Sequence, residues 1–351
     1  MVKPVRVLLL GTGQMGSGIG RLIHAKQGVE LVGGYALRAK RAGMDLGRAI
    51  GLDEDLGLLV GGDLKKLVRQ SRPDVAIQAT CSTILQGRAE LLTLVGAGVN
   101  VISIAEEMAY PAASSPSFAK EIHQLAVAKG VGVLGTGVNP GFVLDLLIIT
   151  LSGACSHISQ IRAERVNDLS PYGHSVLKAQ GVGLTPEEFQ LGLHHGTVMG
   201  HYGFKESIHM IADALGWNIQ DIEEERQPII SKVERRTPFV TVEPGQVAGC
   251  LHQAVAYCAN KPVIILRHPQ QIHPGLEGIE TGDSIEIKGT PMIRLAGSPE
   301  IAGGAATCAL AVNMIPRLLA GPAGLHCMAD LPVPAAVLGD IRQGIHEPVD
   351  L

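Results

Sequence analysis

The stretch that decides the fold reads Val5-Arg6-Val7-Leu8-Leu9-Leu10-Gly11-Thr12-Gly13-Gln14-Met15-Gly16. Its first half is a short apolar run, which is typical of a strand buried on both faces. Its second half has the glycine spacing G-x-G-x-x-G, and apolar residues at helical spacing follow it at Ile19, Leu22 and Ile23. The pattern therefore predicts a strand, a tight loop and an amphipathic helix in direct succession.

Each glycine of this loop has a physical reason. Gly11 permits the tight turn, Gly13 lets the backbone approach a pyrophosphate, and Gly16 lets the helix pack close to the strand. The start of the helix adds backbone N–H donors for an anion. We therefore predict that the loop binds a dinucleotide, with a glycine-rich turn that holds no ligand as the alternative.

Further apolar runs alternate with helical patterns through the N-terminal part of the chain. The predicted strands are 5–10, 29–37, 74–79, 99–104 and 131–134, and helical stretches such as 89–95 and 118–128 separate them. Such alternation indicates a parallel sheet with helices on both faces. We assign residues 1–137 to a doubly wound Rossmann domain of the α/β class.

The pattern changes after Gly137. Strand-like pieces at 159–166, 247–256 and 284–288 surround a helical stretch at 186–215, which indicates a mixed α+β domain over 138–302. A last helix at 303–319 and a loop rich in Gly and Pro at 320–334 follow. We expect this tail, 303–351, to return to the first domain.

The charge, the cysteines and the apolar runs of the chain exclude several classes of protein. The 351 residues include 29 Lys and Arg against 33 Asp and Glu, a net charge of −4, whereas a nucleic-acid binder should carry a basic face. The six cysteines lack Cys-x-x-Cys spacing and no histidines have metal-ligand spacing, so we predict reduced thiols and no metal site. The N-terminus runs straight into a strand, and the longest apolar run, 142–155, is too short for a bilayer. We therefore expect a cytoplasmic protein that does not bind membranes.

The end of the second predicted strand bears on the choice between NAD and NADP. An acidic residue there holds the ribose 2′-hydroxyl of NAD, whereas an arginine accepts the 2′-phosphate of NADP. The chain has Tyr35-Ala36-Leu37-Arg38-Ala39-Lys40-Arg41, with three cations and no carboxylate. We predict NADP, or use of both cofactors, with Arg38 and Arg41 as ligands; a solvated basic loop is the alternative.

Polar residues follow the next strands, at the edge where ligands sit in open α/β sheets. We predict that the residues at the strand ends contact the cofactor, namely Ala79, Thr80, Ser82 and Ser103. Thr80 or Ser82 could equally cap the next helix. Asn139, in the loop 134–142, offers a carbonyl and an amide that suit the carboxamide of nicotinamide. Pro140 and Gly141 would make a turn there in any case.

Two adjacent carboxylates, Glu106 and Glu107, leave the fourth strand at the same edge. A half-buried carboxylate can pair with an ammonium or iminium, or take a proton from attacking ammonia or water. The alternative is that both glutamates open a helix and interact with its dipole. Because adjacent residues point in different directions, we expect one of them, Glu106, to face the substrate.

Several segments together resemble the 2,4-diaminopentanoate dehydrogenase family, to which the native amine dehydrogenases belong. They are the glycine loop, Glu106-Glu107, 137–142, 200–207 and 312–316. The architecture is similar to that of dihydrodipicolinate reductase. The resemblance covers nearly the whole chain and implies a Rossmann domain, a mixed α+β substrate domain and usually a homodimer. It also implies NAD(P)-dependent, reversible oxidative deamination of an amine, run backwards as reductive amination of a ketone or aldehyde with ammonia.

The resemblance further implies roles for individual residues. A glutamate at 106 or 107 would bind ammonia and the iminium. The substrate pocket would be lined by Phe142, Val166, Asp168, Leu169, Tyr172, His195, His201 and Thr307. His195 and His201 could equally be packed or capping residues. Asp168 would be the handle for a second amine in a mostly apolar pocket, and an unsubstituted alkyl amine would not need it.

One departure argues against a dicarboxylate reductase. Such reductases carry paired histidines, a lysine and a Pro-Ser-Gly-Thr segment. In this chain the corresponding segment, 164–172, reads Glu-Arg-Val-Asn-Asp-Leu-Ser-Pro-Tyr, and the later pair His194-His195 has no lysine partner at that spacing. We therefore predict an amine dehydrogenase in which Glu106, or Glu107, positions ammonia, takes its proton and stabilises the iminium. The alternatives are an imine or carbonyl reductase that does not depend on ammonium, and a catalytically silent NAD(P)-binding protein.

Overall fold

The computed structural model of the protein describes residues 3–37 and 41–345. The chain forms two compact units: unit 1 comprises Met1–Phe142 and Ala302–Leu351, and unit 2 comprises Val143–Ile301. The first division falls at residue 142 and not at the expected 137. One reason is that the loop after Gly137 is bound within unit 1, where the backbone N–H of Val138 donates to Thr307 Oγ1 at 3.1 Å.

Unit 1 is built on a seven-stranded sheet in the order β15-β6-β5-β4-β1-β2-β3, with all neighbours parallel. Its strands are β1 Val5–Leu10, β2 Val29–Tyr35, β3 Val60–Gly61, β4 Val75–Gln78, β5 Asn100–Ser103, β6 Gly132–Gly135 and β15 Gly324–His326. The predicted doubly wound parallel sheet is confirmed. The sequence pattern missed β3 and β15, because strands of two and three residues show no periodicity.

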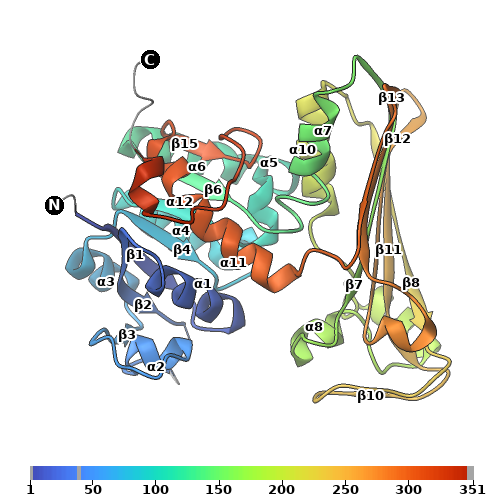
Figure 1. The fold of residues 1–351 in the computed structure, drawn as a ribbon, viewed down its shortest axis with the longest axis horizontal. Helices are drawn as coiled ribbons and strands as arrows, with labels where there is room; N and C mark the ends of the chain where they lie inside the picture. Colours follow the sequence, from blue (N-terminus) through green and yellow to red (C-terminus); the bar gives the residue numbers. More distant parts are fainter. Residues whose placement is uncertain (1–2, 38–40, 346–351) are drawn as a thin grey trace. The chain divides into compact units, whose positions relative to one another are not determined.

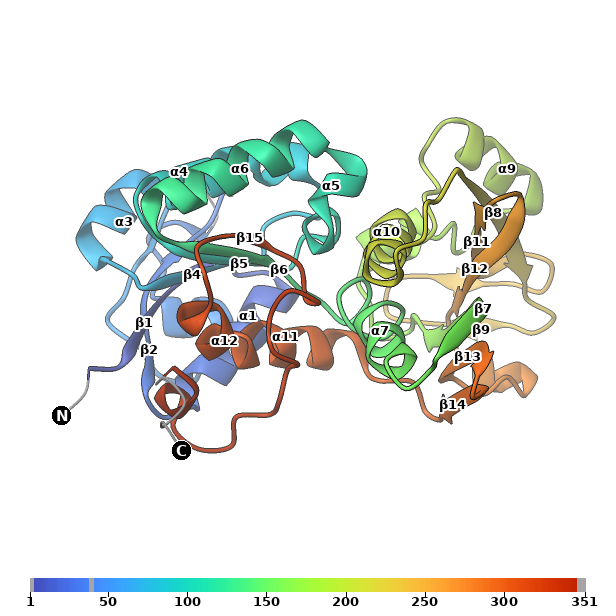
Figure 2. The same ribbon diagram turned by 90° about the horizontal axis from the view of Figure 1, so that it is seen from above.

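Helices cover both faces of this sheet (Figures 1 and 2). They are α1 Gln14–His24, α2 Leu46–Ile50, α3 Leu64–Ser71, α4 Ile84–Gly96, η2 Glu106–Ala109, α5 Pro111–Ser114, α6 Pro116–Lys129, α11 Gly303–Asn313, α12 Ile315–Ala320 and η4 Ile341–Gly344. Figure 2 shows α3, α4 and α6 on one face and α1, α11 and α12 on the other. The core between the sheet and the α4–α6 layer includes Leu91, Val101, Met108 and Ile122, all fully buried.

The last predicted helix, 303–319, is two helices. It breaks at Met314 because Pro316 lies in the first turn of α12 and lacks the N–H that a continuous helix needs. Among the described residues, Gly303–Ala320 is the one stretch long and apolar enough to cross a membrane, with a mean hydropathy of 1.2 and 44% of it buried. Within unit 1, α11 packs on α1, where a Cβ at Gly18 would lie 2.7 Å from Cys308 Sγ. This packing accounts for apolar residues on α11.

Unit 2 is built on a six-stranded sheet in the order β14-β13-β7-β12-β11-β8, in which β7 and β12 are parallel and the other neighbours antiparallel. Its strands are β7 His157–Asp168, β8 Asp221–Ile230, β11 Val247–Cys258, β12 Lys261–Gln271, β13 Gly282–Thr290 and β14 Ile293–Gly297. A separate pair, β9 Arg235–Arg236 and β10 Thr241–Val242, forms a small hairpin. This is the mixed α+β architecture that the sequence predicts.

The helices of unit 2 are α7 Leu146–Ser152, α8 His174–Ala179, α9 Pro186–His194, α10 Phe204–Leu215 and the turn η3 Pro274–Glu277. The single helical stretch predicted at 186–215 is therefore wrong. Gly196, Gly200 and Gly203 between α9 and α10 have φ of +66°, +68° and +113°, which no right-handed helix can include. A capping box at Thr185 and Glu188 fixes the start of α9.

Helices α7 and α10 lie on one face of the unit 2 sheet, which we call the covered face (Figure 2). Phe204, at the start of α10, packs against His252 of β11 on this face, with ring centroids 4.8 Å apart. Along β7, alternate residues are buried on the covered face: Ile161, Ala163, Arg165 and Asn167. The residues between them are exposed or half-buried on the opposite, open face.

Candidate functional site

The loop between β1 and α1 has the geometry that its glycines predict. Gly11 has φ +97°, and a Cβ there would lie 2.5 Å from the carbonyl oxygen of Ala79. A Cβ at Gly16 would lie 2.0 Å from the carbonyl oxygen of Gly11. Both positions therefore need glycine because of the protein's own backbone.

Gly13 differs from these two glycines. Its φ of −75° suits any residue, and a Cβ there would meet no atom of the described chain within 4 Å. Gly13 is also the N-cap of α1, so the first backbone N–H groups of that helix have no capping side chain from this residue. Open space and free donors at a helix start fit the pyrophosphate of NAD(P).

Hydrogen bonds within unit 1 hold the other residues of the loop between β1 and α1. Thr12 is buried, and its carbonyl oxygen accepts from Ser17 Oγ at 3.2 Å. The carbonyl of Met15 accepts from the Cys308 thiol on α11. Gln14 is the first residue of α1. These contacts fix the loop before any ligand binds.

The cation-rich segment after β2 is described only in part. Arg38 lies outside the described residues. Arg41 donates from Nη1 to the carbonyl oxygen of Ala49 at 2.7 Å, so its guanidinium also stabilises the end of α2. Within the described part of 35–41 there is no carboxylate.

A buried polar network joins the ends of β4 and β5. Glu90 of α4 is 6% exposed, and its Oε2 accepts from Thr80 Oγ1 at 2.5 Å and from Gln78 Nε2 at 2.7 Å. Ser103 donates to Gln78 Oε1 at 2.9 Å and accepts from the N–H of Ala105 at 3.2 Å. The hydroxyls of Thr80 and Ser103 therefore hold the sheet edge together, and their contact with a cofactor stays a prediction.

Helix α4 is capped by neither of the residues proposed for that role. Its N-cap is Thr83, whose side chain accepts from the N–H of Gln86. Thr80 binds Glu90 instead, and the Ser82 carbonyl accepts from the N–H of Glu107 at 3.3 Å. Ala79 is held by its N–H to the carbonyl of Leu10 at 2.8 Å.

The paired carboxylates stand at the end of β5, as the first two residues of η2, and both are half-buried. Glu107 Oε2 accepts from the backbone N–H of Ile84 at 2.7 Å, at the start of α4. Burial raises the pKa of the Cys81 thiol to about 11, and the charges of Glu90, Glu106 and Glu107 add to this effect. The charges of three carboxylates therefore act on one thiol near the carboxyl ends of β4 and β5.

The loop 136–142 is the last part of unit 1 before the chain enters unit 2. The bond between Asn139 and Pro140 is cis. Thr136 is buried with no hydrogen-bond partner for Oγ1 among the described residues. Thr307, predicted to line the substrate pocket, is half-buried on α11 and accepts from the Val138 N–H, and half-buried Phe142 ends this part of unit 1.

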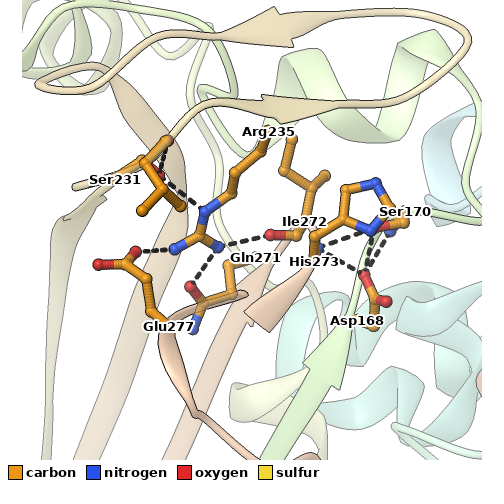
Figure 3. Close-up of polar contacts among 9 residues, drawn as sticks. Asp168, Ser170, Ser231, Arg235, Gln271, Ile272, His273 and Glu277 are labelled. Carbon is orange, nitrogen blue, oxygen red and sulfur yellow. Dashed lines mark hydrogen bonds and ion pairs between the residues drawn. The ribbon is translucent and has the colours of Figure 1, made fainter. Parts of the chain in front are cut away.

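In unit 2, Asp168 is tied to its own loop. Its Oδ1 accepts from the N–H and hydroxyl of Ser170, at 2.8 and 2.5 Å, and from the N–H of His273 at 3.1 Å (Figure 3). His273 has φ +45°, a left-handed conformation that these contacts help to hold. Oδ1 of Asp168 therefore positions a turn, and a role for this residue as the handle of an amine stays a prediction.

A second buried network lies beside this turn. Arg235, 1% exposed, donates to Ser231 Oγ, Gln271 Oε1 and the carbonyl of Ile272, and it pairs with Glu277 (Figure 3). These partners come from β12, η3 and the segment before β9. Arg235 therefore holds the small hairpin to the sheet and is structural.

The other predicted pocket residues of unit 2 do not form one group. Leu169 is in the core cluster against which the half-buried Tyr172 packs. Val166 is half-buried on the open face of β7, opposite Arg165 and Asn167. His195 is exposed at the C-cap of α9. His201 lies on the covered face, 4.8 Å from the ring of His268.

Burial keeps the histidines of the covered face neutral. The pKa values of His201 and His268 are well below the usual value, mainly because burial disfavours the charged ring, and His252 and Arg165 add to the effect for both. Burial also lowers the pKa of His252, although its contact with Glu224 opposes this. No group of three metal-ligating side chains lies together in 3–37 or 41–345.

Sequence reasoning missed the functional candidates Glu90, Arg165, His252, His268 and Gln270. A signal existed for Arg165, because it stands at a buried position in the alternation of β7. His252, His268 and Gln270 come together only through strand register, which the sequence does not give. Glu90 reaches Thr80 and Gln78 only through the packing of α4.

Comparison with known proteins places these features in a family context. A family model described as 2,4-diaminopentanoate dehydrogenase C-terminal domain matches residues 142–347, and one described as dihydrodipicolinate reductase, N-terminus, matches residues 5–103. The chain is 42% identical over 348 residues to 2,4-diaminopentanoate dehydrogenase of Acetoanaerobium sticklandii. The aligned region covers 99% of this chain and 98% of that protein.

Two further relatives are amine dehydrogenases. The chain is 25% identical over 355 residues to an amine dehydrogenase of Streptomyces virginiae, covering 95% of this chain and 98% of that one. The solved structure of an amine dehydrogenase from Mycobacterium smegmatis matches with a TM-score of 0.84 and 26% identity, over 94% of this chain and 97% of that one.

Proposed function

Because the chain belongs to the 2,4-diaminopentanoate dehydrogenase family, we propose that its substrate is 2,4-diaminopentanoate or a close relative, with Glu106 as the catalytic carboxylate. The enzyme class itself follows from the family: the protein is an NAD(P)-dependent amine dehydrogenase. One observation carries the assignment of Glu106. It stands at the end of β5, on the same edge of one parallel sheet as the loop after β1, with β4 between them.

The nicotinamide, when bound, accepts or supplies the hydride. In the direction of amination, the Glu106 carboxylate takes a proton from an ammonium ion, and the ammonia that this releases attacks the carbonyl carbon of the ketone. A proton moves from the nitrogen to the oxygen of the adduct and gives the neutral hemiaminal. Its hydroxyl then leaves as water with the proton that the same carboxyl group returns. The carboxylate then stabilises the positive charge of the iminium while the carbon receives hydride. Protons and charge balance in each step.

The choice of Glu106 over Glu107 is supported by the helix that Glu107 serves. A negative charge and an acceptor at the N-terminus of α4 satisfy a backbone N–H and interact favourably with the helix dipole. Glu107 therefore has a structural function. Glu106 precedes it at the point where the chain leaves the strand.

The proposed cofactor is NADP, with use of NAD as well. The support is the segment after β2, which carries three cations and no carboxylate to hold a ribose 2′-hydroxyl. A homodimer and a cytoplasmic location remain predictions of the family resemblance and of the sequence.

The direct test measures NADPH and NADH oxidation by the purified protein with 2-amino-4-oxopentanoate, with and without ammonium. Oxidation that requires ammonium supports amine dehydrogenation. Oxidation without ammonium would make the protein a carbonyl reductase, and cofactor binding without any turnover would make it a silent binding protein.

A further inference from the structure

The buried carboxylate of Glu90 lies next to the edge of the unit 1 sheet at which ligands bind. Glu90 belongs to α4, and its Oε2 accepts from Thr80 Oγ1 at 2.5 Å and from Gln78 Nε2 at 2.7 Å. Gln78 is the last residue of β4, and Ser103, the last residue of β5, donates to its Oε1. These contacts fix the carboxylate beside the carboxyl ends of β4 and β5.

Within the described residues, no ion pair offsets the charge of this carboxylate. Its two donors are a hydroxyl and an amide, which are both neutral. Arg88, the cation of the same helix, pairs instead with Glu121 of α6. Glu90 is 6% exposed, and its Oε1 is buried without a hydrogen-bond partner in the described chain. Water therefore screens this charge little, and its effect on neighbouring groups is large.

The pKa values of two neighbouring groups reflect this charge. Burial raises the pKa of the Cys81 thiol to about 11, and the charge of Glu90 adds to the effect. Burial also raises the pKa of Tyr35, the last residue of β2, and the charge of Glu90 adds more to this than that of Asp63. The field of Glu90 therefore extends along the sheet edge from the end of β2 to the segment after β4.

The topology of the sheet decides which half of the cofactor this field acts on. The strand order reverses at β1, with β2 and β3 on one side of it and β4, β5 and β6 on the other. A dinucleotide binds across such a point, with its pyrophosphate at the loop after β1 and the adenosine ribose at the end of β2. The nicotinamide half is therefore expected at the ends of β4 and β5, on the side of Glu90.

The nicotinamide ring is the part of the cofactor whose charge changes in the reaction. It carries one positive charge in NADP⁺ and none in NADPH, so a nearby carboxylate stabilises the oxidised form. Hydride transfer to an iminium moves a positive charge from the substrate to the ring. The proposed function of Glu106 is to stabilise the iminium, which by itself opposes this transfer. A second carboxylate beside the ring offsets that effect.

We propose that Glu90 determines the preference of the protein for the redox state of its cofactor. Its carboxylate makes NADP⁺ bind more tightly, relative to NADPH, than it would without this charge. Bound NADPH is then a stronger hydride donor toward the iminium. The inference deepens the proposed function and rests on it for the choice of NADP over NAD. The competing explanation is that Glu90 only holds Thr80 and Gln78 in place.

The test measures the dissociation constants of NADPH and NADP⁺ by calorimetry with the purified full-length protein. Glu90→Gln keeps the side-chain length and a carbonyl oxygen for Thr80 and Gln78, and it removes the charge. We expect the ratio Kd(NADPH)/Kd(NADP⁺) to fall on the order of tenfold, since one charge has this effect over roughly 10 Å at an effective dielectric constant of about 20. A tenfold fall raises the reduction potential of the bound couple by about 30 mV.

Glu121→Gln is the matched control variant. It removes the same charge from α6, where the Glu121 side chain is 44% exposed and pairs with Arg88, and it should leave the ratio unchanged. Adenosine 2′,5′-bisphosphate, which contains only the adenosine half, is the matched control ligand, and Glu90→Gln should not change its Kd. If Glu90→Gln does not fold, the second variant combines Glu90→Met with Gln78→Met. It replaces both partners by apolar side chains of similar length and should lower the ratio by the same factor.

An equal change in all three dissociation constants would overturn the inference and leave Glu90 a structural function. A ratio that stays the same or rises would overturn it as well. If the protein binds NAD in place of NADP, the same ratio is measured with NAD⁺ and NADH, and AMP is the control ligand.

Failure of the proposed function is distinguishable because the test measures binding alone. A protein that shows the expected fall in the ratio but no ammonium-dependent turnover refutes the proposed function and leaves the inference standing. A protein that binds neither cofactor refutes both.

Discussion

The carboxylate of Glu107 accepts a hydrogen bond from the backbone N–H of Ile84 at 2.7 Å, which ties η2 to the start of α4. The two adjacent glutamates at this strand end therefore differ in their contacts. Glu107 stabilises the start of a helix, and Glu106 is the residue that we propose for the chemistry.

Glutamine at each position should separate these functions. We expect Glu106→Gln to lower kcat for reductive amination by about 10²- to 10⁴-fold, since general acid–base catalysis contributes that much. Glu107→Gln keeps an acceptor for Ile84 and should retain most of kcat, while Glu107→Ala should lose about 1 kcal/mol of stability. Steady-state rates and thermal unfolding of the three variants decide, and a larger loss of kcat in Glu107→Gln than in Glu106→Gln would reverse the assignment.

Alanine at two loop glycines should give opposite results. In Gly13→Ala the new methyl group meets no atom of the described residues within 4 Å, so the fold should keep its stability while the Kd for NADPH rises on the order of tenfold. In Gly16→Ala the methyl group meets the Gly11 carbonyl at 2.0 Å, which should cost at least about 1–3 kcal/mol. Unchanged NADPH affinity in a well-folded Gly13→Ala would argue against a pyrophosphate at this place.

Neighbouring arginines on β9 provide a second contrast. Arg235→Met leaves Glu277, Gln271 and Ser231 without a buried partner and should cost about 3–5 kcal/mol. Arg236, whose side chain is 70% exposed and pairs with Glu234, should tolerate the same change within about 1 kcal/mol. Denaturant unfolding measures both, and equal losses would mean that the buried network is not what holds the hairpin.

The neutral histidines of the covered face make stability depend on pH. Because the pKa values of His201 and His268 are depressed in the folded protein, the unfolded chain binds more protons below about pH 6.5. Their contribution is complete above that pH and is lost as the pH falls toward the folded values, by up to about 1.4 kcal/mol per pH unit for each ring. Thermal unfolding between pH 5 and 8 should show this slope, and His268→Gln should reduce it; an identical slope in the variant would assign the effect to other groups.

The sequence predicts the parts of the fold that have a local cause. The strand 5–10, the glycine loop and α1 follow from apolar runs and from the sterics of Gly11 and Gly16. The break between α9 and α10 also had a local cause in Gly196, Gly200 and Gly203, but a helical pattern on both sides concealed it. Short β3 and β15 exist only because neighbouring strands offer hydrogen bonds, so no pattern marks them.

The residues of the candidate site also differ in whether the sequence alone can identify them. Glu106 and Glu107 are found from the sequence because strand ends in a parallel sheet are ligand-binding edges. The separate functions that we propose for them depend on where α4 begins in space. Arg165, His252 and His268 lie on three strands, and only the register of those strands brings them into one row.

Unit 2 interrupts unit 1, and this has a consequence for biosynthesis. While the ribosome is making residues 143–301, β6 is the outer strand of its sheet and its edge is unpaired, because β15 has not yet been translated. The packing partner of α1, helix α11, is also missing at that stage. Unit 1 therefore leaves the ribosome first but is completed only after unit 2 has been made. A message that ends before codon 302 yields a chain in which the edge of β6 stays unpaired, and strands of other chains can pair with it.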